Sequence, residues 1–166
     1  MSNDFYKTNT KKSDNKALPK NISEEDVLYW AETIITTRFS RSNYLTSPDQ
    51  TRDFLHIILS QEYREIFLII FLDSQNGVLG YDSLFQGTID GAVVYPREIV
   101  KSVLTNNAAS VILAHNHPSG KAEPSLADQK ITERIIKALE TIDVKVLDHL
   151  IVGGTSSVSF AERGIL

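Results

Sequence analysis

The sequence predicts an α/β fold in which helices flank a mixed β-sheet. Segments with helical periodicity alternate along the chain with short apolar runs rich in branched and aromatic side chains. The run from Glu65 to Leu72 is almost continuous Ile, Phe and Leu, which is typical of a strand covered on both faces. The 166 residues, 42% of them hydrophobic and none of them cysteine, suffice to bury a core without disulfides.

The N-terminal half is predicted to contain two helices and a hairpin. Ser23 precedes three acidic residues, Glu24-Glu25-Asp26, and an apolar stripe, as at the start of a helix. Ser47-Pro48 begins a second helix, because proline is favourable at the first helical position. After the buried strand, Asn76-Gly77 is a strong hairpin signal. We therefore expect Val78 to Phe85 to return as an antiparallel partner strand.

The C-terminal half continues the alternation of helices and strands. Pro96 begins a helix that ends near residue 106, and residues 108–114 form an apolar run that reads as a buried strand. A helix follows from about Ser125, because apolar residues then recur at helical spacing, at Ile131, Ile135, Leu139 and Ile142. Two further strands are expected over 144–152 and 156–160.

The junction between the 108–114 strand and the following helix carries the strongest functional signal. It reads His115-Asn116-His117-Pro118-Ser119-Gly120, followed by Ser125 and Asp128. Two imidazoles and one carboxylate are the ligand number and type that a catalytic zinc uses while a fourth position stays open. The two histidines are two residues apart at a strand end, so strand alternation points both rings to one side. The sequence therefore predicts a metal site.

The order and spacing of these residues resemble the JAMM (MPN-plus) metalloprotease motif, and the surrounding segments are similar to its bacterial RadC-like branch. The resemblance covers about residues 45 to 166. The segments that carry it are Phe71-Leu72-Asp73, Phe85-Gln86-Gly87-Thr88, Tyr95-Pro96-Arg97-Glu98, His115 through Gly120, and Leu147-Asp148-His149-Leu150-Ile151-Val152-Gly153. The resemblance implies a cytidine-deaminase-like (JAB/MPN) fold, one zinc ion and a metallopeptidase site.

Carried over to this chain, the resemblance makes His115, His117 and Asp128 the zinc ligands. It makes Ser125 a hydrogen-bond donor to the bound water or to the oxyanion. Ser125 and Asp128 also fit a helix capping box, although Glu or Gln is the usual partner at the third position. Both roles of Ser125 stay open, because a capping serine can also face the site.

The motif also requires an upstream carboxylate. The family uses a glutamate on an earlier strand as general acid/base, and the resemblance assigns that position to Asp82. Aspartate is one methylene shorter, and proton transfer requires a heavy-atom distance of about 2.6–3.2 Å or one bridging water. Glu65 and Glu98 are other upstream carboxylates, of which Glu98 is expected to stabilise the start of a helix.

Two residues of the last family-like segment, Asp148 and His149, need a separate interpretation. A carboxylate commonly orients a metal-ligating imidazole by accepting its second N–H, and Asp148 could do this. Ordinary hydrogen bonding at a sheet surface is the interpretation that we favour. His149 is not assigned as a metal ligand.

The resemblance implies a zinc-dependent hydrolase that directs a metal-activated water at an amide or isopeptide bond of a peptide or protein. Because Asp82 replaces the glutamate, an inactive metal-binding MPN-type adaptor is an alternative, as is an accessory role in DNA repair. An overall balance of 17 basic and 21 acidic residues disfavours binding of duplex DNA by the domain. Substrate choice is expected to depend on the loops at 86–95 and 119–124, and the oligomeric state stays open.

The chain is expected to divide into three parts. Residues 1–20 carry five lysines against two aspartates and few large apolar side chains, which predicts a disordered basic arm. A helical segment over 21–44 and the metal-binding domain over 45–166 follow. The arm could contact nucleic acid or an acidic partner, although a solubilising tail is the simpler interpretation. No membrane-spanning run and no signal peptide are evident, so a cytoplasmic protein is expected.

Overall fold

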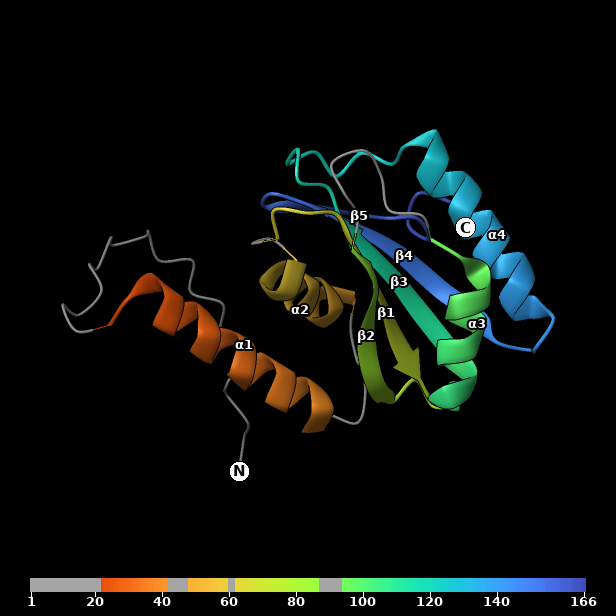
Figure 1. Cartoon of the computed structure of the whole chain (residues 1–166), viewed down its shortest axis with the longest axis horizontal. Coiled ribbons are helices and arrows are strands. Elements are labelled where there is room, and N and C mark those ends of the chain that lie inside the picture. Colours follow the sequence, from red (N-terminus) through yellow and green to blue (C-terminus); the bar gives the residue numbers. More distant parts are fainter. Residues whose placement is uncertain (1–21, 42–47, 60–61, 87–93) are drawn as a thin grey trace, which may run out of the picture.

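The computed structural model describes residues 22–41, 48–59, 62–86 and 94–166 (Figure 1). The elements within these ranges are α1 (Glu24–Arg41), α2 (Pro48–Leu59), β1 (Ile66–Leu72), β2 (Val78–Gln86), α3 (Pro96–Thr105), β3 (Ser110–Asn116), α4 (Leu126–Glu140), β4 (Lys145–Gly153) and β5 (Ser156–Ser159). The α/β fold predicted from the sequence is confirmed. The predicted arm at 1–20 lies outside the described residues, as does most of the 86–95 loop.

The strands form one mixed sheet in the order β2-β1-β3-β4-β5. β3 and β4 run parallel, whereas β2 with β1, β1 with β3, and β4 with β5 are antiparallel pairs. A parallel pair needs a crossover connection, which α4 supplies between β3 and β4. The carboxyl end of β3 and the amino end of α4 consequently lie at the same edge of the sheet.

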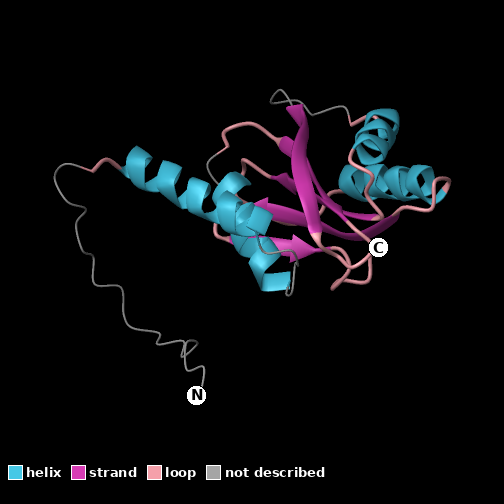
Figure 2. Ribbon diagram, turned by 90° about the horizontal axis from the view of Figure 1, so that it is seen from below, coloured by secondary structure: helices cyan, strands magenta, loops and turns pink. Residues whose placement is uncertain are grey.

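Helices cover both faces of the sheet. α2 packs on one face, where Phe54 and Leu55 join apolar side chains of β1, β3 and β4. α3 and α4 pack together on the opposite face, as Figures 1 and 2 show, over a second apolar cluster. β1 alternates between the two clusters, with Ile70 in the first and Ile69 in the second. Every residue of β1 is buried, which explains its unbroken apolar sequence.

α1 lies outside these layers and packs against α2 and β2. Its first turn is capped by Ser23, whose hydroxyl accepts the Asp26 amide at 3.1 Å. Among the described residues, no helix has both the length and the apolar character that crossing a membrane requires.

The predicted hairpin between β1 and β2 is confirmed, with a turn over residues 73–77. Asn76 has a φ of 62°, a left-handed conformation that asparagine tolerates better than most residues. The Asp73 carboxylate accepts the amides of Gln75 and Gly77 at 2.8 and 2.7 Å, which closes the turn. The register of the hairpin then sets Asp82 of β2 opposite Ile69 of β1.

Gly153, the last residue of β4, lies against the chain that follows the histidine-containing turn. A Cβ atom on Gly153 would lie 2.4 Å from the Ala122 amide nitrogen and 2.6 Å from the Lys121 carbonyl carbon. Both distances are well inside van der Waals contact, and the neighbouring atoms belong to backbone, which cannot rotate away. Only glycine lets the two segments approach this closely.

Replacing Gly153 with alanine is expected to lower the free energy of unfolding by about 1–3 kcal/mol, the usual cost of overpacking. Gly80→Ala is the matched control, because a Cβ on Gly80 of β2 would meet no atom within 4 Å. Chemical denaturation of both variants measures the difference. Equal losses in the two variants would contradict the close approach.

Candidate metal centre

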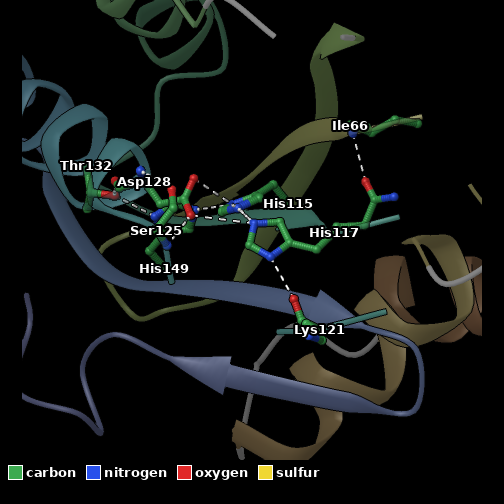
Figure 3. Close-up of polar contacts among 9 residues, drawn as sticks. Ile66, His115, His117, Lys121, Ser125, Asp128, Thr132 and His149 are labelled. Atoms are coloured by element: carbon green, nitrogen blue, oxygen red, sulfur yellow. Dashed lines mark hydrogen bonds and ion pairs between the residues drawn. The ribbon is translucent and has the colours of Figure 1, made fainter. Parts of the chain in front are cut away.

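Three side chains from two elements converge at the edge where β3 ends and α4 begins (Figure 3). The His115 and His117 Nε2 atoms lie 3.0 Å apart. The Asp128 carboxylate approaches them from the first turn of α4, with Oδ1 at 3.4 Å from His115 Nε2 and Oδ2 at 3.5 Å from His117 Nε2. These three residues could hold a metal ion, because each offers a ligand atom to the same point.

Local backbone structure brings the two imidazoles together. His115 lies on β3, and His117 directly follows the strand, with its amide donating to the Val152 carbonyl of β4 at 2.8 Å. Gly120 then turns the chain with a φ of 78°, where a side chain would be strained. His117 Nδ1 lies 2.8 Å from the Lys121 carbonyl, which can only accept, so Nδ1 carries the proton and donates it. The lone pair of His117 Nε2 is thereby left for a metal.

Asp128 is fixed by a capping box at the start of α4. The Ser125 hydroxyl accepts the Asp128 amide at 3.1 Å, and Asp128 Oδ2 accepts the Ser125 amide at 2.7 Å. The capping interpretation of Ser125 and Asp128 is therefore correct even though aspartate replaces the usual Glu or Gln. Because Ser125 Oγ accepts the amide, its own O–H remains available as a donor.

The charges at the centre support one another. Burial alone would raise the pKa of Asp128, but its contacts with the His115 and His117 rings and with Ser125 outweigh burial and hold the pKa far below its ordinary value. The hydrogen bond with Asp128 in turn raises the pKa of His117 above 6.5, against the opposing effect of burial. An ionised carboxylate beside two imidazoles is also the state that a divalent cation requires of these ligands.

A cavity of about 400 Å³ opens onto this centre. Besides the three converging side chains, it is lined by Glu65, Phe67, Val94, Ser125, Ala127, Ile131 and Arg134. Glu65 directly precedes β1, and Phe67 pairs with His115 across the β1–β3 ladder. Strand alternation puts Glu65 on the same side of the sheet as Phe67. A carboxylate and a hydroxyl thus line the same cavity as the candidate metal ligands.

Asp82, the residue that the family resemblance assigns as the base, lies elsewhere. It is exposed on β2 and lines a separate groove with Glu98 and Lys101 of α3. Its partner Ile69 pairs in turn with Leu113 of β3, two residues before His115. Two strand spacings of about 4.8 Å separate β2 from β3, a gap that a short aspartate side chain does not span. The register, which the sequence does not specify, removes Asp82 from the cavity.

Asn116 lies between the two histidines, but its side chain points away from theirs. It holds the segment that contains Glu65. Its side-chain oxygen accepts the Ile66 amide at 2.7 Å. Its side-chain nitrogen donates to the carbonyls of Glu62 and Arg64 at 3.2 and 2.9 Å. The backbone on both sides of Glu65 is therefore tied to the turn that carries the histidines.

The preference for ordinary hydrogen bonding agrees with the structure for Asp148, but the expected sheet-surface position is wrong for His149, which is fully buried. Its carboxylate accepts the His149 amide at 2.7 Å, the Ser159 hydroxyl at 2.6 Å and the Ala161 amide at 3.0 Å, which joins β4 to the chain after β5. The residue that contacts a metal-site imidazole is instead His149, whose ring lies 2.8 Å from His115 Nδ1. No local pattern distinguishes this buried histidine, because the contact joins residues 34 positions apart.

Comparison with known sequences identifies the family of the chain. The sequence model described as the RadC-like JAB domain matches residues 45–165. The chain belongs to this family. A UPF0758 protein of Vibrio parahaemolyticus is 50% identical over 145 residues, which cover 87% of this chain and 65% of that protein. Related UPF0758 proteins are 53% identical over 140 residues in Idiomarina loihiensis (84% and 62% covered) and 50% identical over 143 residues in Vibrio cholerae (86% and 90% covered).

The family resemblance inferred from the sequence is thus confirmed. The chain spans less than two thirds of the length of the relatives from Vibrio parahaemolyticus and Idiomarina loihiensis.

The raised pKa of His117 predicts how the stability of the metal-free protein changes with pH. The His117–Asp128 contact contributes fully below the unfolded-state pKa of about 6.5 and is lost as the pH rises through the higher folded-state pKa. The free energy of unfolding after chelation should therefore fall as the pH rises from about 6.5 through the raised pKa of His117. In Asp128→Asn the same pH range should have a smaller effect. Denaturant unfolding at several pH values tests this, and identical pH profiles for the two proteins would contradict it.

Proposed function

We propose that the chain is a zinc-dependent hydrolase of the JAMM metallopeptidase type, which cleaves an amide or isopeptide bond in a peptide or protein. The observation that carries the proposal is the convergence of His115, His117 and Asp128 in the lining of a cavity that Glu65 and Ser125 also line. Three ligands, a nearby carboxylate and a hydroxyl donor are the set that metal-assisted hydrolysis requires.

The three ligand atoms suit the size of a zinc ion. Zinc–nitrogen and zinc–oxygen bonds of about 2.0–2.1 Å imply about 3.3 Å between neighbouring ligand atoms of a tetrahedron. In this chain the two histidine Nε2 atoms lie 3.0 Å apart, and the two Asp128 carboxylate oxygens lie 3.4 Å from His115 Nε2 and 3.5 Å from His117 Nε2, one oxygen facing each ring. Imidazole nitrogens also favour zinc over calcium or magnesium, which prefer oxygen ligands. Three protein ligands would leave a fourth position of a tetrahedral zinc ion open.

A zinc ion held by these residues would activate a water molecule and polarise the scissile carbonyl. The residues of the chain would do the remaining work. We assign Glu65 as the general base that takes a proton from the attacking water and returns it to the leaving amine. The Ser125 hydroxyl, which already accepts the Asp128 amide, would donate to the developing oxyanion.

The alternative functions draw less support from the structure. The adaptor interpretation depended on Asp82 as a shortened base, and a longer carboxylate, Glu65, lines the cavity instead. A neighbouring groove that includes His117 is lined by Glu24, Glu25 and Glu62. Three carboxylates beside the site would repel a phosphate backbone, which disfavours a nucleic-acid substrate.

The first test concerns the metal. Untagged protein should contain about one zinc per chain by elemental analysis, and His115→Ala/His117→Ala should contain none, because a single carboxylate does not retain zinc. His56→Ala on α2 serves as the control, since that histidine lies outside the cluster, and it should keep its zinc. Equal zinc in all three proteins would exclude the site.

The second test concerns the base. A proteome-derived peptide mixture incubated with the protein in ¹⁸O-labelled water should yield newly labelled carboxyl termini by mass spectrometry. Glu65→Gln should bind zinc normally but lose about 10²–10⁴-fold in rate, the usual contribution of a general base. Asp82→Asn should leave the rate unchanged.

The opposite pattern in these variants would restore Asp82 as the base. Zinc-loaded wild-type protein that cleaves neither peptides nor isopeptide-linked conjugates would favour the adaptor instead.

A further inference from the structure

We propose that His149 and Thr132 are positioning residues, which hold His115 in the one tautomer that can bind a metal through Nε2. Neither residue touches the point where His115, His117 and Asp128 converge, and they act through His115 and the backbone of Asp128. The inference rests on the proposed metal site but not on hydrolysis.

These contacts form a continuous series of buried hydrogen bonds. His149, on β4, is 0% exposed, and its Nε2 lies 2.8 Å from His115 Nδ1. Its Nδ1 lies 2.6 Å from the hydroxyl oxygen of Thr132 on α4. That same hydroxyl lies 2.6 Å from the backbone carbonyl of Asp128, one helical turn earlier. Figure 3 shows Thr132, His149 and Asp128 grouped beside His115.

The direction of each hydrogen bond in this series follows from its last acceptor, the backbone carbonyl of Asp128. The Asp128 carbonyl can only accept, so the single proton of the Thr132 hydroxyl is donated to it. Thr132 Oγ1 can then only accept from His149, which places the proton of that ring on Nδ1. A fully buried ring that bonds to an imidazole and a hydroxyl, and not to a carboxylate, is neutral, because an unpaired buried cation is costly.

The neutral His149 ring therefore presents an unprotonated Nε2 to His115. His115 must donate from Nδ1, and its own Nε2 is left without a proton. This Nε2 is the atom that lies 3.0 Å from His117 Nε2 and 3.4 Å from Asp128 Oδ1. Since His117 donates from Nδ1 to Lys121, both imidazoles direct lone pairs at the same point. Two lone pairs that face one another at this distance repel unless a proton or a metal ion lies between them.

The arrangement also fixes the ring of His115 in space. His115 packs parallel to Phe67 with ring centroids 6.1 Å apart, and His149 is held edge-on to Phe67 and against Phe160. The hydrogen bonds then join β3, β4 and α4. The spacing of these elements must be kept if His115 on β3, His117 directly after it and Asp128 on α4 are to meet. Without the Thr132 hydroxyl, His149 could carry its proton on Nε2, and His115 would then carry its own on the metal-facing nitrogen.

The matched pair Thr132→Val and Thr132→Ser isolates the hydroxyl. Valine keeps the branched shape but removes the hydroxyl, whereas serine keeps the hydroxyl. Zinc affinity, measured by competition with a chromophoric chelator, should fall about 10-fold or more in Thr132→Val and stay near wild type in Thr132→Ser, as for other residues that orient a metal ligand. His149→Phe and His149→Gln repeat the comparison, because glutamine keeps an acceptor for His115. Circular dichroism melts establish that each variant is folded.

A spectroscopic measurement on metal-free protein reads the tautomer directly. Long-range ¹H–¹⁵N correlation spectra should show His115 protonated at Nδ1 in the wild type, and Thr132→Val should shift it toward the Nε2-protonated form. Wild-type His115 protonated at Nε2, or equal zinc affinities for Thr132→Val and Thr132→Ser, would overturn the inference. Wild-type protein that binds no zinc would instead overturn the proposed function, while the tautomer measurement would still decide the role of His149.

Discussion

The site depends on the approach of the Asp128 carboxylate to the two imidazoles that end β3. A carboxylate in this largely buried position is unfavourable unless positive charge or hydrogen-bond donors compensate it. Here the Ser125 amide at the N-cap of α4 compensates part of this charge, and a proton or a metal ion held by the two imidazoles would compensate the rest. The same carboxylate therefore starts the helix and completes the candidate metal centre, so that neither can shift without the other.

Because Asp128 has both roles, several separate features of the fold help to keep the candidate metal centre in place. The β3–α4–β4 crossover brings the helix start to the strand end. Gly153 lets the chain after the histidine turn lie against β4, which holds the Lys121 carbonyl where His117 can donate to it. Asn116 ties the same turn to the segment before β1 and so positions Glu65 at the cavity. Local geometry at each of these positions limits how far apart the three candidate metal-ligand atoms can move.

Much of this arrangement could be predicted from the sequence, because the signals are local. The unbroken apolar run of β1, the Asn76-Gly77 turn and Pro96 at the start of α3 mark elements that the structure contains. The spacing of His115, His117 and Asp128 depends on one strand end and one helix turn, and these atoms do converge. The structure does not bring Asp82 to this cavity, and the sequence could not show that, because it depends on the register between strands and on which residues share a cavity. The contacts of His149 and Thr132 are equally non-local and have no sequence signature.

The central claim is that two imidazole nitrogens and one carboxylate oxygen share a single zinc ion. Anomalous diffraction at the zinc absorption edge, from crystals of untagged protein grown without added metal, tests it most directly. We expect one strong peak about 2.0–2.2 Å from His115 Nε2, His117 Nε2 and an Asp128 carboxylate oxygen, on the side that faces the Glu65 cavity. A zinc-replete crystal with its only peak elsewhere, or with these three side chains turned apart, would contradict the account.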